Sequence, residues 1–142
     1  MDNLTPAQRT RAMRRVRSRD TFPERRVRSV AHRLGYRFRL SGCGLPGSPD
    51  LAFPRLRAAV FVHGCFWHQH ECERGSRMPQ TNRSYWRAKL ARNVERDAKA
   101  VRALRRLKWR VLVVWECQTA DAGRLRSILA RFLAASEPPR SV

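Results

Sequence analysis

The stretch AAVFVHGCFWHQHEC, residues 58–72, joins an apolar run to a loop that is dense in metal-binding side chains. Its first six residues, AAVFVH, are mostly apolar and partly β-branched or aromatic, which predicts a short buried strand ending at His63. The loop that follows holds two cysteines, two histidines and two adjacent large aromatic residues. A fold organised around this strand therefore presents the loop at one end of its sheet.

Hydrophobic periodicity on either side of this stretch predicts four helices and three further strands. Residues 21–35 combine a capping-box pattern, Thr21 with Glu24, with an apolar face and a terminal Gly35. The tract WRVLVVWE at 109–116 is a continuous apolar run of the kind that is buried on both faces of a sheet. The other expected elements are helices at 5–19, 83–107 and 123–135 and strands at 36–40 and 50–53. From residue 21 onward the order is helix, three strands, helix, strand, helix, which predicts an α/β fold with a mixed sheet flanked by helices.

Two of these elements carry a clear apolar side. The strand at 36–40 alternates so that Tyr36, Phe38 and Leu40 share one face. The helix at 83–107 has a single stripe, which consists of Trp86, Leu90, Val94, Val101 and Leu104. The Arg-rich helix at 5–19 has little apolar content, so we expect it to become ordered only against a partner.

Arginine and lysine outnumber the acidic residues 31 to 11 in this chain of 142 residues, so the formal net charge is +20. A protein this basic suits a polyanionic partner; nucleic acid is the first candidate and an anionic membrane surface the second. A GC-rich genome would also inflate the arginine content. The sequence has no run near the roughly 18 apolar residues of a membrane span and no signal peptide. We therefore expect a cytoplasmic protein whose cysteines are free thiols or metal ligands.

Three cysteines lie where predicted strands end. Cys65 follows the strand AAVFVH, Cys72 closes the loop, and Cys117 follows WRVLVVWE. If these two strands are neighbours, the cysteines meet, and three cysteines with one histidine form a closed tetrahedral zinc site of the structural kind. The spacing leaves the fourth ligand open among His63, His68, His70 and Cys43, and three unrelated buried cysteines are the alternative.

Three acidic residues, Glu24, Asp50 and Asp97, fall on faces expected to be buried, while His63 ends a strand and His68 follows Trp67 in the loop. A buried carboxylate is costly unless it is paired or bound to a metal, so the acidic residues are candidate ligands or supports for Mg²⁺. Histidines beside them could move protons at a phosphate. The alternatives are a helix cap for Glu24, a surface ion pair for Asp97 and a turn position for Asp50.

Phe66 and Trp67 are adjacent in a polar loop, and neighbouring residues in extended chain point in opposite directions. They could insert between DNA bases, or they could cover the edge of the sheet.

Four motifs together resemble the very-short-patch repair (Vsr) endonucleases. They are LPGSPD at 45–50, FVHGCFWHQHEC at 61–72, NVERD at 93–97 and WRVLVVWEC at 109–117. The likeness runs from about residue 9 to Cys117. The resemblance implies a restriction-endonuclease-like core and an enzyme that nicks DNA on the 5′ side of the thymine in a T:G mismatch, the product of 5-methylcytosine deamination.

The resemblance also implies a role for individual residues. Asp50 and the backbone carbonyl of Val62 would bind Mg²⁺, while His63 and His68 would act at the scissile phosphate through metal-bound water. Glu24 and Asp97 would orient these groups. The structural zinc ligands would be Cys65, His70, Cys72 and Cys117. The residues that intercalate at or lie near the mismatch would be Phe66, Trp67, Met13 and Trp86.

From the motifs and the resemblance we expect an Arg-rich DNA-binding helix at 1–19, an endonuclease domain at 20–135 and a disordered tail at 136–142. The expected partner is double-stranded DNA with a T:G mismatch, with mismatch-repair proteins as further candidates, no membrane, and a monomeric state. The expected location is the bacterial cytoplasm, in association with the nucleoid. Two other functions fit the residues: a zinc-stabilised DNA-binding module without catalysis, and a restriction-type nuclease that cuts intact duplex.

Overall fold

The computed structural model describes residues 21–40, 44–65, 70, 72, 79 and 81–136. The helix expected at 5–19 lies outside these residues, as does the tail expected at 136–142 apart from Ser136, which ends a helix. The proposed division of the chain into an N-terminal helix, a nuclease domain and a tail therefore stays a prediction.

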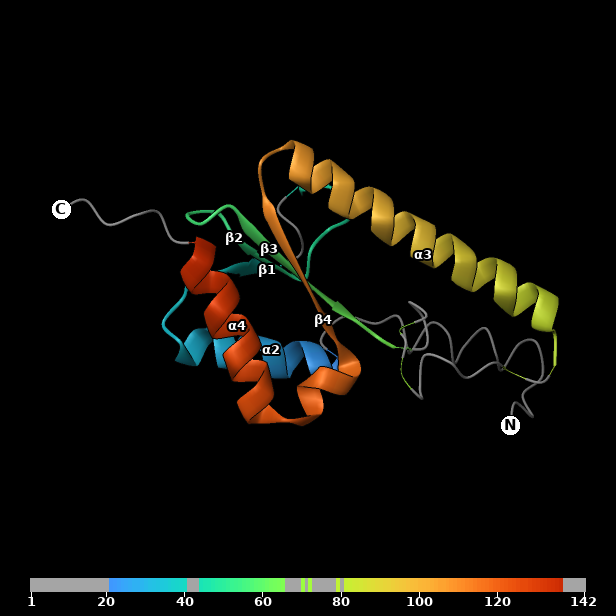
Figure 1. Ribbon diagram of the computed structural model, residues 1–142, viewed down its shortest axis with the longest axis horizontal. Helices are drawn as coiled ribbons and strands as arrows, with labels where there is room; N and C mark the ends of the chain where they lie inside the picture. Colours follow the sequence, from blue (N-terminus) through green and yellow to red (C-terminus); the bar gives the residue numbers. More distant parts are fainter. Residues whose placement is uncertain are drawn as a thin grey trace.

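A four-stranded sheet lies at the centre of the fold (Figure 1). Its strand order is β1-β2-β3-β4, with β1 antiparallel to β2, β2 antiparallel to β3, and β3 parallel to β4. The strands are β1 (Arg39–Leu40), β2 (Leu51–Phe53), β3 (Ala58–His63) and β4 (Arg110–Trp115). The helical elements are α2 (Phe22–Arg33), α3 (Arg83–Arg106), the 3₁₀ turn η2 (Glu116–Ala120) and α4 (Ala122–Ser136). The predicted mixed sheet flanked by helices is thus confirmed for the described residues.

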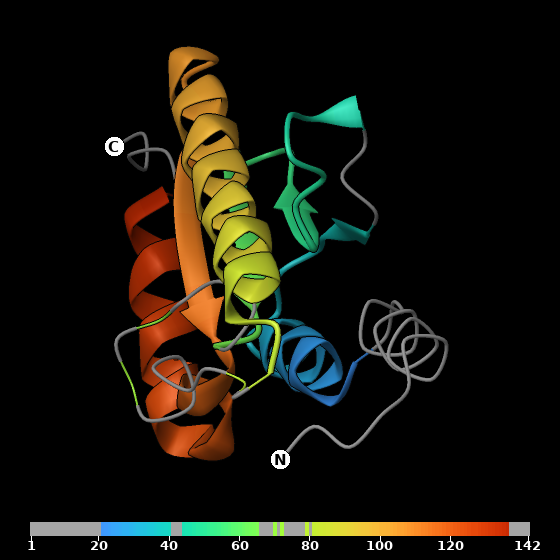
Figure 2. The same ribbon diagram turned by 90° about the vertical axis from the view of Figure 1, so that its right-hand side faces the viewer.

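Helices cover both faces of this sheet, as the end-on view shows (Figure 2). Alternate residues of β3 point to opposite faces. One set, including Val60, packs with α2 and α4 in a single apolar core. The buried members of that core are Val27, Ala31, Leu51, Phe53, Ala58, Val60, Val114, Leu125, Leu129 and Leu133.

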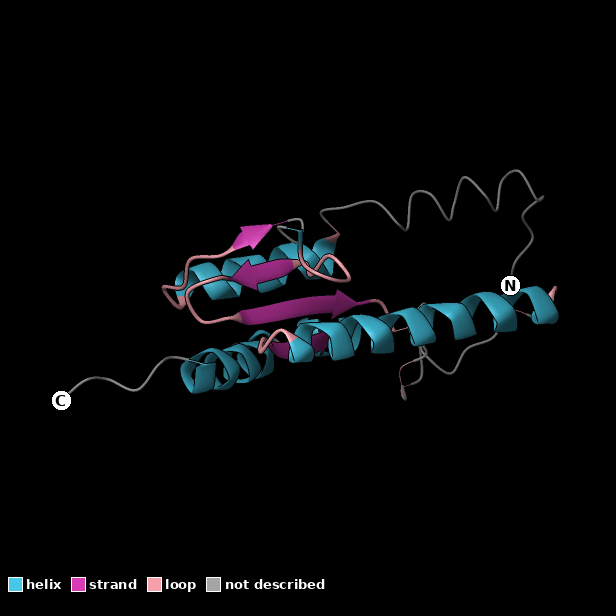
Figure 3. Ribbon diagram, turned by 90° about the horizontal axis from the view of Figure 1, so that it is seen from above, coloured by secondary structure: helices cyan, strands magenta, loops and turns pink. Residues whose placement is uncertain are grey.

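The other face packs against α3 with a smaller core cluster, whose buried members are Ala59, Phe61 and Leu104. Since α3 has 24 residues and β3 has six, much of the helix extends past the sheet. Its first turns project beyond the carboxyl end of β3 (Figures 1 and 3). This end of the sheet is therefore bordered by both α3 and the loop that leaves β3.

Local signals explain why the helices form where they do. In α2, the Thr21 hydroxyl accepts the Glu24 amide at 3.4 Å, and Pro23 occupies the first turn. The chain then reverses at Gly35, which has a left-handed φ of 89°. None of the helices in the described part of the chain has the length and apolar character needed to span a bilayer.

The strand predicted at 36–40 is shorter than expected. Only Arg39 and Leu40 pair with β2, and Leu40 is 44% exposed. Tyr36 and Phe38 still pack edge-on against Phe53, so their side chains contribute to the core without ladder hydrogen bonds.

Two expectations about burial are also wrong. The tract at 109–116 was expected to be buried on both faces, but β4 is an edge strand in which only Val114 is buried. The six-residue strand that is buried on both faces is instead β3, an interior strand in which Val62 alone is half-buried. Val94 lies on the predicted stripe of α3 but is 42% exposed, because it borders the open cavity between α3 and β4.

The turn before β2 is held tightly against its neighbours. Gly47 has a φ of 73°, and a Cβ atom there would collide with the Ala100 side chain and lie 3.3 Å from Phe61. Only glycine suits this position, because it combines a left-handed backbone with a close approach to α3. The turn fixes where the chain enters β2, and it therefore fixes the position of Asp50, the residue just before that strand.

Candidate active site and metal centre

The carboxyl ends of β3 and β4 coincide, because the two parallel strands pair in a register that sets His63 beside Trp115. Cys65 and Cys117 each follow two residues later. The Cys117 amide donates to Cys65 Sγ at 3.4 Å, which joins the two chain segments just beyond the sheet. The expectation that these strands are neighbours is confirmed, and it explains how residues 52 positions apart come together.

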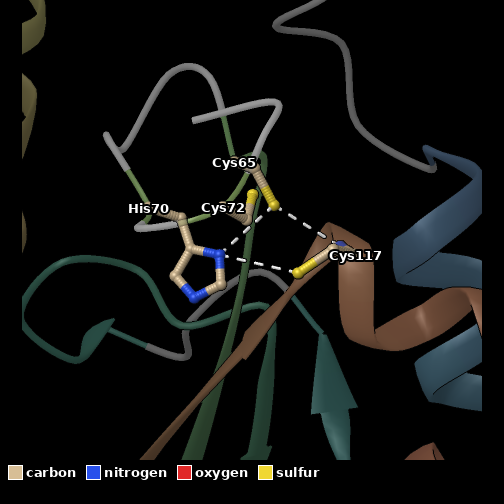
Figure 4. Close-up of side chains that lie close together, drawn as sticks. All are labelled: Cys65, His70, Cys72 and Cys117. Carbon is tan, nitrogen blue, oxygen red and sulfur yellow. Dashed lines mark hydrogen bonds between the residues drawn. The ribbon is translucent and has the colours of Figure 1, made fainter. Parts of the chain in front are cut away.

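Four potential ligands converge at this place (Figure 4). One ligand atom from each residue lies within 4.8 Å of the others, and the residues are Cys65, His70, Cys72 and Cys117. His70 Nδ1 is 3.7 Å from Cys65 Sγ and 3.5 Å from Cys117 Sγ. A tetrahedral zinc ion, about 2.3 Å from sulfur and about 2.1 Å from nitrogen, sets its ligand atoms roughly 3.5–3.8 Å apart. The cluster could therefore hold a metal ion such as zinc.

The Cys65 side chain is fully buried within this cluster. Burial raises the pKa of the Cys65 thiol to about 12, with further increases from the neighbouring Cys72 and Cys117 thiols, while the Cys117 amide lowers it. Without a metal the thiol is the stable form at neutral pH, and metal binding requires that its proton be released.

Asp50 lies just before β2 and faces the carboxyl end of β3. Its Oδ2 accepts the Val62 amide at 2.6 Å. In the antiparallel ladder, Leu51 lies opposite Val60. The same register would set Pro49 opposite Val62, so the Asp50 carboxylate accepts the Val62 amide just outside the paired part of the two strands. Within a strand, the amide and carbonyl of one residue point to the same side. The Val62 carbonyl therefore also points toward the Asp50 side of the strand.

His63 follows Val62 and faces α3. Its Nδ1 lies 3.9 Å from Asp97 Oδ2, and its side chain is only 8% exposed. Both residues line an open cavity of about 350 Å³ between α3 and β4. Arg102, Arg105 and Trp115 also line it, so one wall of the cavity is basic. The structure thus brings Asp50, Val62 and His63 together along one strand end, with Asp97 behind the histidine.

Glu24 and Trp86 lie on the helices around this end. The Thr21 hydroxyl accepts the Glu24 amide at the start of α2, and the Glu24 carboxylate lies 4.0 Å from Arg28, so the role of Glu24 at the site stays a prediction. Trp86 is in the first turn of α3, is 5% exposed and packs edge-on against Tyr85. In this DNA-free structure Trp86 is therefore a packed residue, and its role at a mismatch stays a prediction.

Four expected site residues lie outside the described residues: Met13, Phe66, Trp67 and His68. Cys43, an alternative fourth ligand of the metal cluster, also lies outside them. Their roles stay predictions.

No role at the site was predicted from the sequence for Trp115. The indole of Trp115 stacks on the His70 ring, with centroids 4.2 Å apart and planes at 12°, and meets the His63 ring edge-on at 5.3 Å. The motif WEC at the end of a strand was a usable signal, since strand pairing with VHGC places Trp115 beside His63.

Comparisons with known proteins show the family to which the chain is similar. The family model described as DNA mismatch endonuclease Vsr matches residues 1–74. The type II nicking enzyme V.XorIIP of Xanthomonas oryzae pv. oryzae is 46% identical over 135 residues, which cover 95% of this chain and 98% of that protein. The DNA mismatch endonuclease Vsr of Escherichia coli is 42% identical over 78% of this chain and 70% of its own length. The type II nicking enzyme V.NmeAIP of Neisseria meningitidis is 34% identical over 93% and 94%.

Proposed function

Because the chain belongs to the Vsr family of DNA endonucleases, we propose that it nicks duplex DNA on the 5′ side of the thymine in a T:G mismatch. Its DNA endonuclease class follows from the family. The mismatch, the strand and the dependence on Mg²⁺ are the proposed part. We further propose that it acts as a monomer, in the cytoplasm of a bacterium and in contact with the nucleoid.

The observation that carries this proposal is the position of Asp50. Its carboxylate meets the Val62 amide at 2.6 Å, one residue before His63, at the carboxyl end of β3. A carboxylate and a backbone carbonyl on one strand edge, next to a histidine, suit Mg²⁺ bound by few protein oxygens together with a phosphate. We assign Asp50 and the Val62 carbonyl as the protein ligands of that ion. When bound, Mg²⁺ would neutralise charge on the phosphate.

The histidines would carry the proton transfers. His63 is held between β4 and α3, where the Asp97 carboxylate at 3.9 Å favours the ring orientation that leaves Nε2 for the substrate. We propose the same kind of role for His68, and we propose that Glu24 supports the site from the first turn of α2.

Positive charge would bring DNA to this surface. The formal net charge of +20 and the arginines of α3 beside the cavity provide contacts for phosphates. The affinity should therefore fall steeply as salt rises. We propose that Phe66, Trp67 and Met13 then open the mismatched step, with Trp86 nearby, because a mismatched pair is less costly to unstack than a matched one.

A zinc ion in the cluster of Cys65, His70, Cys72 and Cys117 would tie the loop after β3 to the segment after β4. This role is structural, because four protein ligands leave no open position for substrate.

The deciding experiment is a cleavage assay on two labelled duplexes that differ only in one pair, T:G or T:A, with and without Mg²⁺. The proposal expects a nick on the thymine strand of the T:G duplex alone, and only with the metal. Equal cutting of both duplexes would instead support a restriction-type nuclease. Tight binding without any cut would support a zinc-stabilised DNA-binding module.

A further inference from the structure

Trp115 occupies a junction between the metal cluster and the candidate cleavage site. It is the last residue of β4 and pairs in register with His63, the last residue of β3. Side chains at paired positions of neighbouring strands lie on the same face. The Trp115 side chain therefore stands beside His63 on the face of the sheet that α3 covers.

The indole contacts two histidines that belong to different groups. The His70 ring lies nearly parallel to it, at 12° and 4.2 Å between centroids, while His70 Nδ1 points at two cysteine sulfurs. The His63 ring meets the indole at 76° and 5.3 Å. Stacked and edge-to-face contacts are both favourable and directional, so one indole restrains the planes of two rings.

Trp115 is itself held firmly. Its amide donates to Gln118 Oε1 at 2.8 Å, at the point where β4 turns into η2. The side chain is half-buried and forms part of the cavity wall next to Asp97. Val111 and Val113 share this face of β4 and pack under α3, whereas Trp115 lies at the end of the strand where the cavity opens.

We propose that Trp115 is a positioning residue that orients His70 for metal binding and His63 for cleavage through the same indole ring. The metal cluster and the cleavage site are then mechanically coupled, although they share no ligand. The part that concerns His63 rests on the proposed nuclease function, whereas the part that concerns His70 does not.

The test compares three variants of the full-length, metal-loaded protein. Trp115→Leu removes the ring, and Trp115→Phe keeps a smaller ring. Trp109→Leu is the matched control, because Trp109 adjoins the opposite end of β4 and packs under α3. Two readouts are needed: metal release to a coloured chelator together with the visible spectrum of the Co²⁺-loaded protein, and kcat and KM for nicking the T:G duplex.

We expect Trp115→Leu to release metal about tenfold faster and to shift the Co²⁺ bands, as loss of support around a ligand does. We also expect kcat to fall about tenfold with KM within about twofold, because the basic DNA-binding surface is unchanged. Trp115→Phe should fall between wild type and Trp115→Leu in both readouts. Trp109→Leu should match wild type within about twofold.

Equal behaviour of Trp115→Leu and Trp109→Leu would overturn the proposal, and so would a lower kcat with unchanged metal release and spectrum. If Trp115→Leu does not fold, Trp115→Phe decides by the same criteria. If wild-type protein cuts no duplex, the proposed function fails together with the link to His63. In that case, faster metal release from Trp115→Leu would still support the proposal that Trp115 orients His70 for metal binding.

Discussion

The two faces of the sheet differ in what they bury. The face under α2 and α4 buries ten apolar residues in one continuous core. The core cluster under α3 has three buried members, and at its carboxyl end this face has His63, Asp97 and an open cavity instead. Both faces are built from alternate residues of the same strands, so the difference arises from what covers them.

The contrast suggests a division of labour. A continuous apolar core stabilises the fold and tolerates no polar group without a partner. An incomplete core leaves polar side chains close to solvent and to a substrate. Substitutions on the two faces should therefore have separable effects, with stability changing on one and cleavage on the other.

The largest effect is expected at Asp50. Asp50→Asn keeps an oxygen that can accept the Val62 amide but removes the charge, so folding should be preserved while kcat falls at least about a thousandfold. The rate of nicking the T:G duplex measures the change in kcat, and the thermal unfolding midpoint measures whether folding is preserved. Asp121→Asn, at the start of α4, is the control and should behave as wild type. Full activity of Asp50→Asn would remove this residue from the site.

On the opposite face, Leu129→Ala should lower the free energy of unfolding by about 2–5 kcal/mol, because Leu129 is fully buried and its loss leaves a cavity. Denaturant unfolding measures this change. Below the unfolding transition, kcat should stay within about twofold of wild type. A large loss of kcat in a fully folded Leu129→Ala protein would contradict the separation of the two faces.

The metal cluster lies where both faces end, and Cys117→Ser tests its role. We expect the affinity for zinc to fall at least about a hundredfold and the unfolding midpoint to fall with it. Zinc content and thermal unfolding are the measurements. Cys43→Ser, which leaves the four clustered residues intact, should change neither. A Cys117→Ser protein of normal stability and zinc content that no longer cleaves DNA would argue against a structural role.

The smallest effect is expected at Asp97. Asp97→Asn should lower kcat about tenfold, roughly 1.4 kcal/mol in the barrier, because we expect the carboxylate to act on cleavage only through His63. Glu95→Gln is the control on the same helix, since its side chain is 70% exposed and pairs with Lys99. Equal rates for the two variants would show that Asp97 is a surface residue of α3.

Most elements of the fold were predictable because their signals are local. The cap at Thr21 and the periodic leucines of α4 lie within a few residues of the structure that they produce. The exposure of Val94 and the edge position of β4 were not predictable. The first depends on the cavity left between α3 and β4 and the second on where the sheet stops, and no local pattern encodes either.

The site divides in the same way. Cys65 and Cys72 lie within eight consecutive residues, so their spacing marks them as candidate ligands, whereas His70 was singled out only by the resemblance to the family. The motifs of residues 61–72 and 109–117 likewise sufficed to predict the family, which the comparisons confirm. The mismatch specificity and the assigned roles of the site residues stay predictions.

What the sequence determined by itself was therefore the three α-helices of the described residues, most strands, the family and the chemical types available at the site. Only the tertiary structure decided which of them meet: Cys117 with Cys65, Asp50 with the Val62 amide, and Trp115 with two histidines. The physical reason is strand register. A shift of one residue between β3 and β4 would turn every side chain to the other face, and that register is set by packing across the whole sheet.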